Sequence, residues 1–461
     1  MFFRYNANMF DRKIENELLI WKQKERRKPL ILRGARQTGK TTLVRKFARR
    51  FSSLVELNLE KDAIRKIFSE VKNIGEIIQT IEGITNQRIV PNETLLFLDE
   101  IQNSAEAIKL LRYFYEEMPG LHVIGSGSLL EVRMKKEGWS FPVGRVEFLY
   151  LYPVTFEEFL EALGENILLR SLKGCGVNTP LPPALHERLF DFLLDYMVVG
   201  GMPEAVNEYI SSKSFVSIRQ YHEALTASFK EDFAKYARGL SIEQLKLVWD
   251  RIPFEIGTRI KYSRLAGLEA RSAEVSRSFD ILHEAMLVER VFPTSRFVFP
   301  LVTKPKASPK PIFLDIGLCS YVLNFTRDQI KQKFMDPAYS GALSEQFVGQ
   351  ELLALNSLNR NPLYFWVREE KGASSELDFL VQANGKLIPI EVKSGRQGSL
   401  KSLHQFLYRS GTRLGVRFYN GPLTRETQHV LLPDTSSLDY QLLSFPLYAV
   451  FRLLEFLGEF Q

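Results

Sequence analysis

Residues 34–41 read Gly-Ala-Arg-Gln-Thr-Gly-Lys-Thr, which matches the pattern G-x-x-x-x-G-K-[ST]. The residues just before it, 29–32, form an apolar run typical of a short buried strand, and residues 42–51 carry the apolar spacing of a helix. Glycine-rich turns before helices are common. The complete pattern between a strand and a helix, however, is typical of a loop whose backbone N–H groups surround nucleotide phosphates. The sequence therefore predicts a nucleotide-binding α/β unit.

This pattern also predicts what individual residues do. Lys40 is expected to reach the β- and γ-phosphates, and Thr41 to ligate Mg²⁺. The N-terminus of the helix that follows adds a partial positive charge at the same place. The predicted nucleotide-binding residues of the loop are Gly34, Ala35, Arg36, Gln37, Thr38, Gly39, Lys40, Thr41 and Thr42.

Two later strands are expected to end at the same site. The apolar run 95–98 leads into Asp99 and Glu100, as in a buried parallel strand whose carboxyl end meets a ligand. Asp99 is expected to hold Mg²⁺ through water, and Glu100 to orient and polarise the attacking water. An Asp-Glu pair can also simply cap the next helix. The run 121–124 ends in Gly-Ser-Gly-Ser, which places Ser126 where a γ-phosphate sensor belongs, although such clusters are also ordinary turns.

The composition indicates a globular protein without a membrane span. The chain has 461 residues, of which 45% are hydrophobic and 25% charged. That length predicts about two to four domains. No apolar run approaches the roughly 20 residues that cross a bilayer, and the first residues lack the features of a signal peptide. Cys175 and Cys319 are far apart and show no metal-ligand spacing, which favours reduced thiols. We expect a cytoplasmic protein with no membrane partner.

The positive charge is unevenly distributed. The formal net charge is +7, yet residues 1–50 alone contain fifteen Lys/Arg and four Asp/Glu. A basic patch beside the nucleotide loop would suit DNA. A solvated helix face explains the same residues equally well.

The middle of the chain reads as mainly helical. Thr155 and Glu158 form a capping box, and Gly200-Gly201 interrupts a helical pattern. Residues 241–300 suggest three helices followed by a strand, the layout of a winged helix-turn-helix whose third helix could enter a DNA major groove. Arg271 and Arg277 are the only basic residues in or just before that helix, so an interaction module remains equally open. The polar, proline-rich run 303–311 indicates a linker.

A second group of acidic residues lies near the C-terminus. Asp378 and Glu391 are expected on neighbouring strands joined by the Asn384-Gly385 turn, with Lys393 on the same face as Glu391. Glu345 lies on a preceding helix. Two carboxylates beside a lysine can hold Mg²⁺ and activate water for phosphodiester hydrolysis. The spacing Asp…Glu-x-Lys matches the PD-(D/E)xK nuclease pattern. Alternating Glu and Lys also occur on solvated strands, but the opposite face here is apolar.

Together these motifs give the whole chain a resemblance to a known family. It resembles prokaryotic AAA-type ATPases that carry a C-terminal domain of unknown function with a PD-(D/E)xK-like core. The motifs that carry the resemblance are residues 34–43, 96–102, 125–128, 144–145, 200–204, 313–318, 341–345, 376–379 and 388–393. One departure is Ser344, where phenylalanine is expected next to Glu345.

The resemblance implies a multidomain α/β architecture. Its parts are a P-loop ATPase core at 1–155, a helical lid at 156–240, a winged helix-turn-helix at 241–302 and a PD-(D/E)xK-like domain at 303–461. Arg145 falls in the family's Gly-Arg position, which implies an arginine finger or sensor at a γ-phosphate, or else a structural ion pair. The resemblance also implies that hydrolysis needs an arginine from a neighbouring subunit, hence a homo-oligomer.

Three functions follow from these expectations. The leading one is an ATPase that binds ATP and Mg²⁺ and uses turnover to move the lid or the C-terminal domain. The second is an ATP-regulated DNA endonuclease, for example one acting in defence, which would use Glu345, Asp378, Glu391 and Lys393. The third is a non-enzymatic, nucleotide-gated module that binds DNA or protein.

Overall fold

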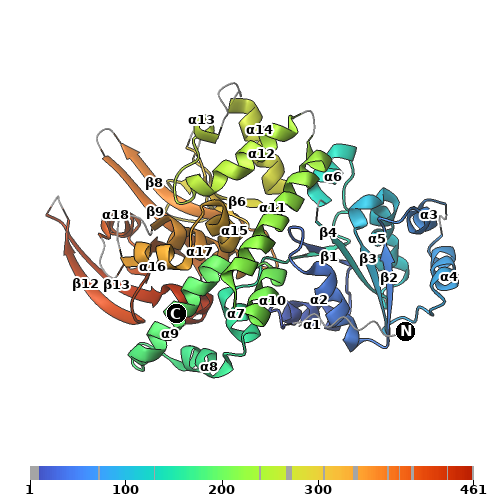
Figure 1. Cartoon of the computed structure of the whole chain (residues 1–461), viewed down its shortest axis with the longest axis horizontal. Coiled ribbons are helices and arrows are strands. Elements are labelled where there is room, and N and C mark those ends of the chain that lie inside the picture. The colour runs from blue at the N-terminus through green and yellow to red at the C-terminus, as the bar shows by residue number, and fades with distance from the viewer. Residues whose placement is uncertain are drawn as a thin grey trace.

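The computed structural model describes residues 10–70, 73–128, 130–237, 240–265, 272–304, 307–335, 341–370, 373–383, 385–395, 399–432 and 435–458. Figure 1 shows two sheets separated by a group of helices, with the N-terminal sheet at one end of the long axis and the C-terminal sheet at the other. Among the described residues, no helix combines the length and the apolar character that crossing a bilayer requires.

The N-terminal sheet is parallel and has the strand order β2-β3-β4-β1-β5. Its strands are β1 (Leu30–Arg33), β2 (Ser53–Asn58), β3 (Thr94–Asp99), β4 (His122–Gly127) and β5 (Glu147–Tyr150). Its helices are α1 (Glu15–Gln23), α2 (Lys40–Phe47), α3 (Asp62–Glu70), α4 (Ile74–Thr85), α5 (Ala105–Glu117) and α6 (Leu130–Glu137). Every residue of β3 is buried because helices cover both faces. The predicted strands of the core are confirmed.

A helical group follows the first sheet. It consists of α7 (Phe156–Ala162), α8 (Asn166–Gly174), α9 (Pro183–Val199), α10 (Pro203–Ser212) and α11 (Phe215–Tyr236). The capping box predicted at Thr155 and Glu158 is present at the start of α7. Phe156 and Tyr196 pack edge-on against Phe347 of the C-terminal part, with ring centroids 6.2 and 5.9 Å away. The helices therefore share a core with the second sheet.

The predicted winged-helix segment contains its three helices. They are α12 (Ile242–Arg251), α13 (Tyr262–Leu265) and α14 (Ser272–Glu284). The strand that follows, β6 (Val288–Thr294), pairs with β7 (Lys310–Phe313) and β8 (Leu363–Glu370) inside the C-terminal sheet. Strands on both sides of the predicted boundary at 302/303 thus belong to one sheet. Arg277 is exposed, and Arg271 lies outside the described residues.

The C-terminal sheet has eight strands in the order β12-β13-β11-β10-β9-β8-β6-β7. Its remaining strands are β9 (Ala373–Ala383), β10 (Lys386–Val392), β11 (Leu414–Tyr419), β12 (Thr424–Leu431) and β13 (Ser437–Pro446). The helices here are α15 (Ile316–Val322), α16 (Arg327–Met335), α17 (Gly341–Ala354), α18 (Lys401–Ser410) and α19 (Leu453–Gly458). The antiparallel pairing of β9 with β10 fits the predicted hairpin, although Asn384 of its turn lies outside the described residues. The predicted linker is shorter than expected, because Lys310 and Pro311 belong to β7.

Asp315 joins the helical group to the C-terminal part. Its carboxylate caps α15 by accepting from the N–H of Leu318 at 3.0 Å, and accepts from the N–H of Gly201 at 2.6 Å. A Cβ on Gly200 would lie 2.1 Å from Asp315 Oδ1, and one on Gly317 would lie 2.5 Å from the nitrogen of Gly200. Glycine at both positions is therefore required for the two segments to approach this closely.

This buried carboxyl predicts a pH-dependent stability. Burial raises the pKa of Asp315 to about 6, although its backbone hydrogen bonds oppose the rise. In the unfolded chain the Asp315 carboxyl has its ordinary pKa of about 4. Between pH ~4 and ~6 the folded chain therefore keeps a proton on this carboxyl that the unfolded chain has lost. The stability that this proton contributes is complete below pH ~4 and is lost between pH ~4 and ~6, by about 3 kcal/mol.

The test compares the wild-type chain with Asp315→Asn by thermal unfolding at pH 5 and pH 7. The variant is expected to gain stability relative to wild type at the higher pH, because the asparagine has no charge to bury. An altered hydrogen bond in the variant can also change its stability, but a change that is the same at both pH values cancels when the two pH values are compared. A difference in stability that does not change with pH would contradict the prediction.

Candidate nucleotide-binding site

The predicted phosphate loop lies between β1 and α2, at the carboxyl edge of the parallel sheet. Gly39, the N-cap of α2, has φ +92°, a conformation that favours glycine. A Cβ on Gly34 would lie 2.5 Å from the carbonyl oxygen of Leu151. Both glycines of the pattern are therefore needed for the shape of the loop. Thr38 Oγ1 also donates to the carbonyl of Ala35 at 2.9 Å.

Lys40 is buried beneath this loop. Its ammonium donates to the carbonyl oxygens of Gly34 at 2.9 Å and Ala35 at 2.8 Å. Burial lowers the pKa of Lys40 to about 8, while the nearby Glu100 and Asp99 raise it in part. A buried ammonium held by neutral carbonyls keeps its charge available for an anion. This is the chemistry that a phosphate group requires.

The Asp99 carboxylate, at the end of β3, links that strand to α2 and β4. Its Oδ2 accepts from the hydroxyl of Thr41 at 3.0 Å, and its Oδ1 accepts from the hydroxyl of Ser126. Carboxylate and hydroxyl oxygens are the donors that Mg²⁺ prefers, so this set fits the ion. Ser126 is buried against Asp99, whereas Ser128 lines the cleft described below. The sequence analysis placed a γ-phosphate sensor at Ser126. Of the two serines, however, Ser128 is the one that lines the cleft.

Glu100 follows β3 in an unusual backbone conformation. Its φ of +53° and ψ of +44° are left-handed, which is uncommon for a residue other than glycine. The side chain accepts from the amide of Gln102 and lines the cleft beside the loop. Such local strain persists where the surroundings fix it, and it is concentrated at functional sites.

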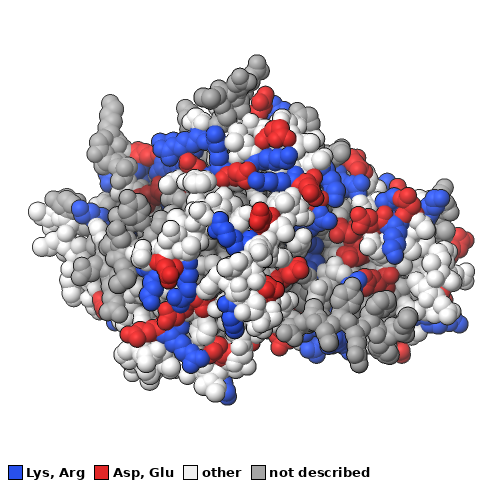
Figure 2. All heavy atoms as spheres, in the orientation of Figure 1, with Lys and Arg blue, Asp and Glu red and all other residues white. Residues whose placement is uncertain are grey.

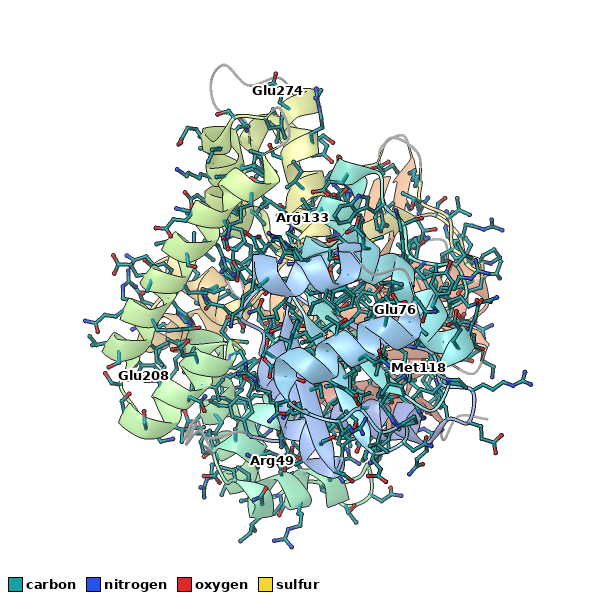
Figure 3. The ribbon with its side chains drawn as sticks, turned by 90° about the vertical axis from the view of Figure 1, so that its right-hand side faces the viewer. Arg49, Glu76, Met118, Arg133, Glu208 and Glu274 are labelled. Carbon is teal, nitrogen blue, oxygen red and sulfur yellow. The ribbon has the colours of Figure 1, made fainter. Side chains whose placement is uncertain are left out.

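A cleft of about 670 Å³ opens above the loop. One wall is the loop and α2. The other is α10, which contributes Pro203, Glu204, Asn207, Glu208 and Ser211. Figure 3 labels Glu208 on the green helices that stand beside the blue core. Arg36 of the loop also forms an ion pair with Asp232 of α11. The sequence analysis did not predict these α10 residues at the site, although Gly200-Gly201-Met202-Pro203 marks the start of the helix.

Arg145 lies away from this cleft. It precedes β5, which runs parallel to β1 with Glu147 opposite Leu30, so it is at the amino edge of the sheet. The loop is at the carboxyl edge. Arg145 Nε instead donates to Glu116 at 2.8 Å. This ion pair is the structural alternative that the sequence analysis left open, and a role of Arg145 at an ATP γ-phosphate stays a prediction.

The basic residues of the first fifty are partly neutralised. Lys24 pairs with Glu147 at 2.5 Å, Arg45 with Glu56 at 2.7 Å, and Lys46 with Glu15 at 2.6 Å. On the face shown in Figure 2, positive and negative side chains of the described residues are interspersed. The described residues visible on that face thus form no basic stripe for DNA to follow.

The C-terminal acidic residues do come together. Ile390 of β10 pairs with Phe379 of β9, so Glu391 and Asp378 are neighbours across the hairpin. Lys393 Nζ donates to Glu391 at 2.6 Å. Burial raises the pKa of Glu391 to about 8, and that of Glu345 on α17 to about 7. The sequence analysis missed a further member of this group, Lys310, whose ammonium lies 2.8 Å from Glu345 Oε1.

Comparison with known families agrees with the loop geometry. Residues 26–160 match a family model described as an AAA domain. The N-terminal part of the chain is therefore similar to AAA domains. Residues 191–329 and 340–433 match two further models, both described as domains of unknown function (DUF8612 and DUF4143). No curated protein matches the sequence.

Solved structures show a more distant likeness. The Walker-type ATPase PABY2304 of Pyrococcus abyssi is 15% identical with a TM-score of 0.43, covering 69% of this chain and 97% of its own. The ORC2 protein of Aeropyrum pernix, solved as ADPNP–ADP complexes, is 14% identical with a TM-score of 0.36, covering 72% and 98%. The RuvB Holliday junction branch migration motor of Thermotoga maritima is 14% identical with a TM-score of 0.29, covering 64% and 93%. At these TM-scores the likenesses carry no functional argument.

Proposed function

We propose that this chain is a Mg²⁺-dependent ATPase that couples ATP hydrolysis to movement of its PD-(D/E)xK-like C-terminal domain. The observation that carries the proposal is the convergence of Lys40, Thr41, Asp99 and Glu100 on one cleft. Thr41 and Asp99 would hold Mg²⁺, which would offset phosphate charge. Lys40 would bind the β- and γ-phosphates, and Glu100 would orient a water and take its proton.

The route of coupling follows from the contacts of α10. This helix forms one wall of the cleft and begins directly after Gly201, whose N–H donates to Asp315. Asp315 in turn follows β7 of the C-terminal sheet. A shift of α10 around bound ATP would therefore act on the end of β7. The ion pair of Arg36 with Asp232 gives the loop a second direct contact with the helical group.

Two finer points belong to the same proposal. In a homo-oligomer, Arg145 would act as a finger toward the ATP of a neighbouring subunit, since its side chain is 42% exposed and lies at the opposite sheet edge from its own loop. DNA is a candidate partner, which stimulation of ATP turnover by added DNA would reveal. A nucleotide-gated binding module, by contrast, would bind ATP without turning it over.

The test measures ATP turnover with Mg²⁺ together with amide hydrogen exchange. We expect turnover and, with a non-hydrolysable ATP analogue, greater protection of α10 and of residues 310–322, because the cleft wall becomes ordered. The variant Lys40→Ala should show neither effect. Binding without turnover would refute the ATPase. Turnover without any change of protection at 310–322 would refute the coupling alone.

A further inference from the structure

The C-terminal acidic group surrounds a buried lysine. Lys310 Nζ lies 2.8 Å from Glu345 Oε1, 2.7 Å from Glu376 Oε1 and 3.6 Å from Asp378 Oδ1. Only 2% of the Lys310 side chain is exposed. These carboxylates come from α17 and β9, whereas the lysine comes from β7. The cation is therefore supplied by a strand outside the hairpin that carries the Asp…Glu-x-Lys pattern.

Two of these carboxylates are the ones expected to bind metal. Glu345 and Asp378 were predicted as part of a nuclease-like Mg²⁺ site, and both now face the Lys310 ammonium. The distances suit hydrogen bonds from an ammonium, which are longer than the ~2.1 Å of a Mg²⁺–oxygen bond. Within the described residues, no three His, Cys, Asp or Glu side chains are arranged to hold a metal ion.

Glu391, the second carboxylate of the Asp…Glu-x-Lys pattern, differs from the other carboxylates of the group in its hydrogen bonding. Glu391 is 5% exposed, and its Oε1 accepts from Lys393, but its buried Oε2 has no hydrogen-bond partner among the described residues. A buried carboxylate oxygen without a donor is costly and indicates capacity for a further cation or donor. Glu376 is already engaged, since its second oxygen accepts from Arg259 at 2.7 Å.

We propose that the Lys310 ammonium occupies the place of a divalent cation between Glu345 and Asp378. The C-terminal site is thereby closed to Mg²⁺, and the folded chain does not cleave DNA there. Removing the ammonium would leave Glu345 and Asp378, beside Glu391, free to move together around a divalent cation. This inference is independent of the proposed ATPase activity, because it concerns the nucleotide-free chain.

The test titrates Mn²⁺ into the full-length, nucleotide-free chain by calorimetry and follows thermal unfolding with and without Mn²⁺. Wild type is expected to show no Mn²⁺ binding that depends on Asp378. The variant Lys310→Met should bind one Mn²⁺ more than ~100-fold more tightly, since the positive charge that fills the place between Glu345 and Asp378 has been removed. Mn²⁺ should also raise the unfolding temperature of this variant, and not that of wild type.

Three matched variants make the result specific. Lys310→Arg keeps the positive charge and should remain closed to Mn²⁺. The same is expected of Lys393→Met, which removes the lysine that pairs with Glu391. Lys310→Met combined with Asp378→Asn should lose the new site. Any binding that Asp99→Asn removes instead belongs to the phosphate loop and leaves the inference standing.

Two results would overturn the proposal. One is a folded Lys310→Met variant whose Mn²⁺ affinity and unfolding temperature are those of wild type. The other is Mn²⁺ binding or plasmid cleavage by the wild-type chain that Asp378→Asn abolishes. The second measurement needs no Lys310 variant, so the proposal stays testable even if the loss of this buried charge prevents folding.

Discussion

Lys40→Ala is expected to abolish ATP binding while leaving the fold intact. Its ammonium donates to the carbonyls of Gly34 and Ala35, and Lys40 itself lines the cleft, so water can replace the ammonium. Alanine also suits the first turn of α2. Losing two charge-assisted contacts to phosphate at ~1.5–2 kcal/mol each should weaken binding by at least ~100-fold. Calorimetry with a non-hydrolysable ATP analogue measures this directly.

Arg45→Ala is the matched control. Arg45 lies on the same helix, but its guanidinium pairs with Glu56 and does not line the cleft. Its removal should leave nucleotide affinity unchanged, and circular dichroism should show both variants folded. Wild-type affinity in Lys40→Ala would mean that the loop does not bind phosphate through this lysine, and the proposed site would have to be abandoned.

The nucleotide site was predictable because its signals are local. Glycine, lysine and threonine at fixed spacing between a strand and a helix determine the shape of the loop, and the apolar run before Asp99 predicts a strand covered on both faces. The family match to residues 26–160 agrees with that part of the analysis. The role of each site residue remains a prediction until it is measured.

The other features depend on partners distant in sequence. Lys310 stands among prolines and was assigned to a linker, yet its carboxylate partners lie on α17 and β9. The strand at β6 was predicted, but its pairing within the C-terminal sheet depends on long-range contacts. Arg145 was placed near ATP by motif alone, whereas its position before β5 puts it at the opposite edge. The local sequence pattern predicts each helix or strand, whereas tertiary packing determines which residues that element contacts.

Glu100→Gln is expected to retain ATP binding and lose turnover. The amide keeps the size of the side chain and can still accept from Gln102, but it cannot take a proton from the attacking water. Loss of a general base lowers the rate by ~10²–10⁴-fold. Because the left-handed backbone of Glu100 is no more strained with glutamine, the geometry of the cleft should persist. Steady-state phosphate release and calorimetry measure the two effects separately.

The control is Glu106→Gln, which removes an exposed carboxylate from the first turn of α5, outside the cleft. It should leave both ATP affinity and turnover unchanged. If Glu100→Gln still hydrolysed ATP at the wild-type rate, another group would activate the water. If it lost ATP affinity instead, Glu100 would act in holding the nucleotide. Only retained binding with lost turnover is consistent with a base at this position, because Lys40, proposed to bind the phosphates, and Thr41, proposed to hold Mg²⁺, are untouched.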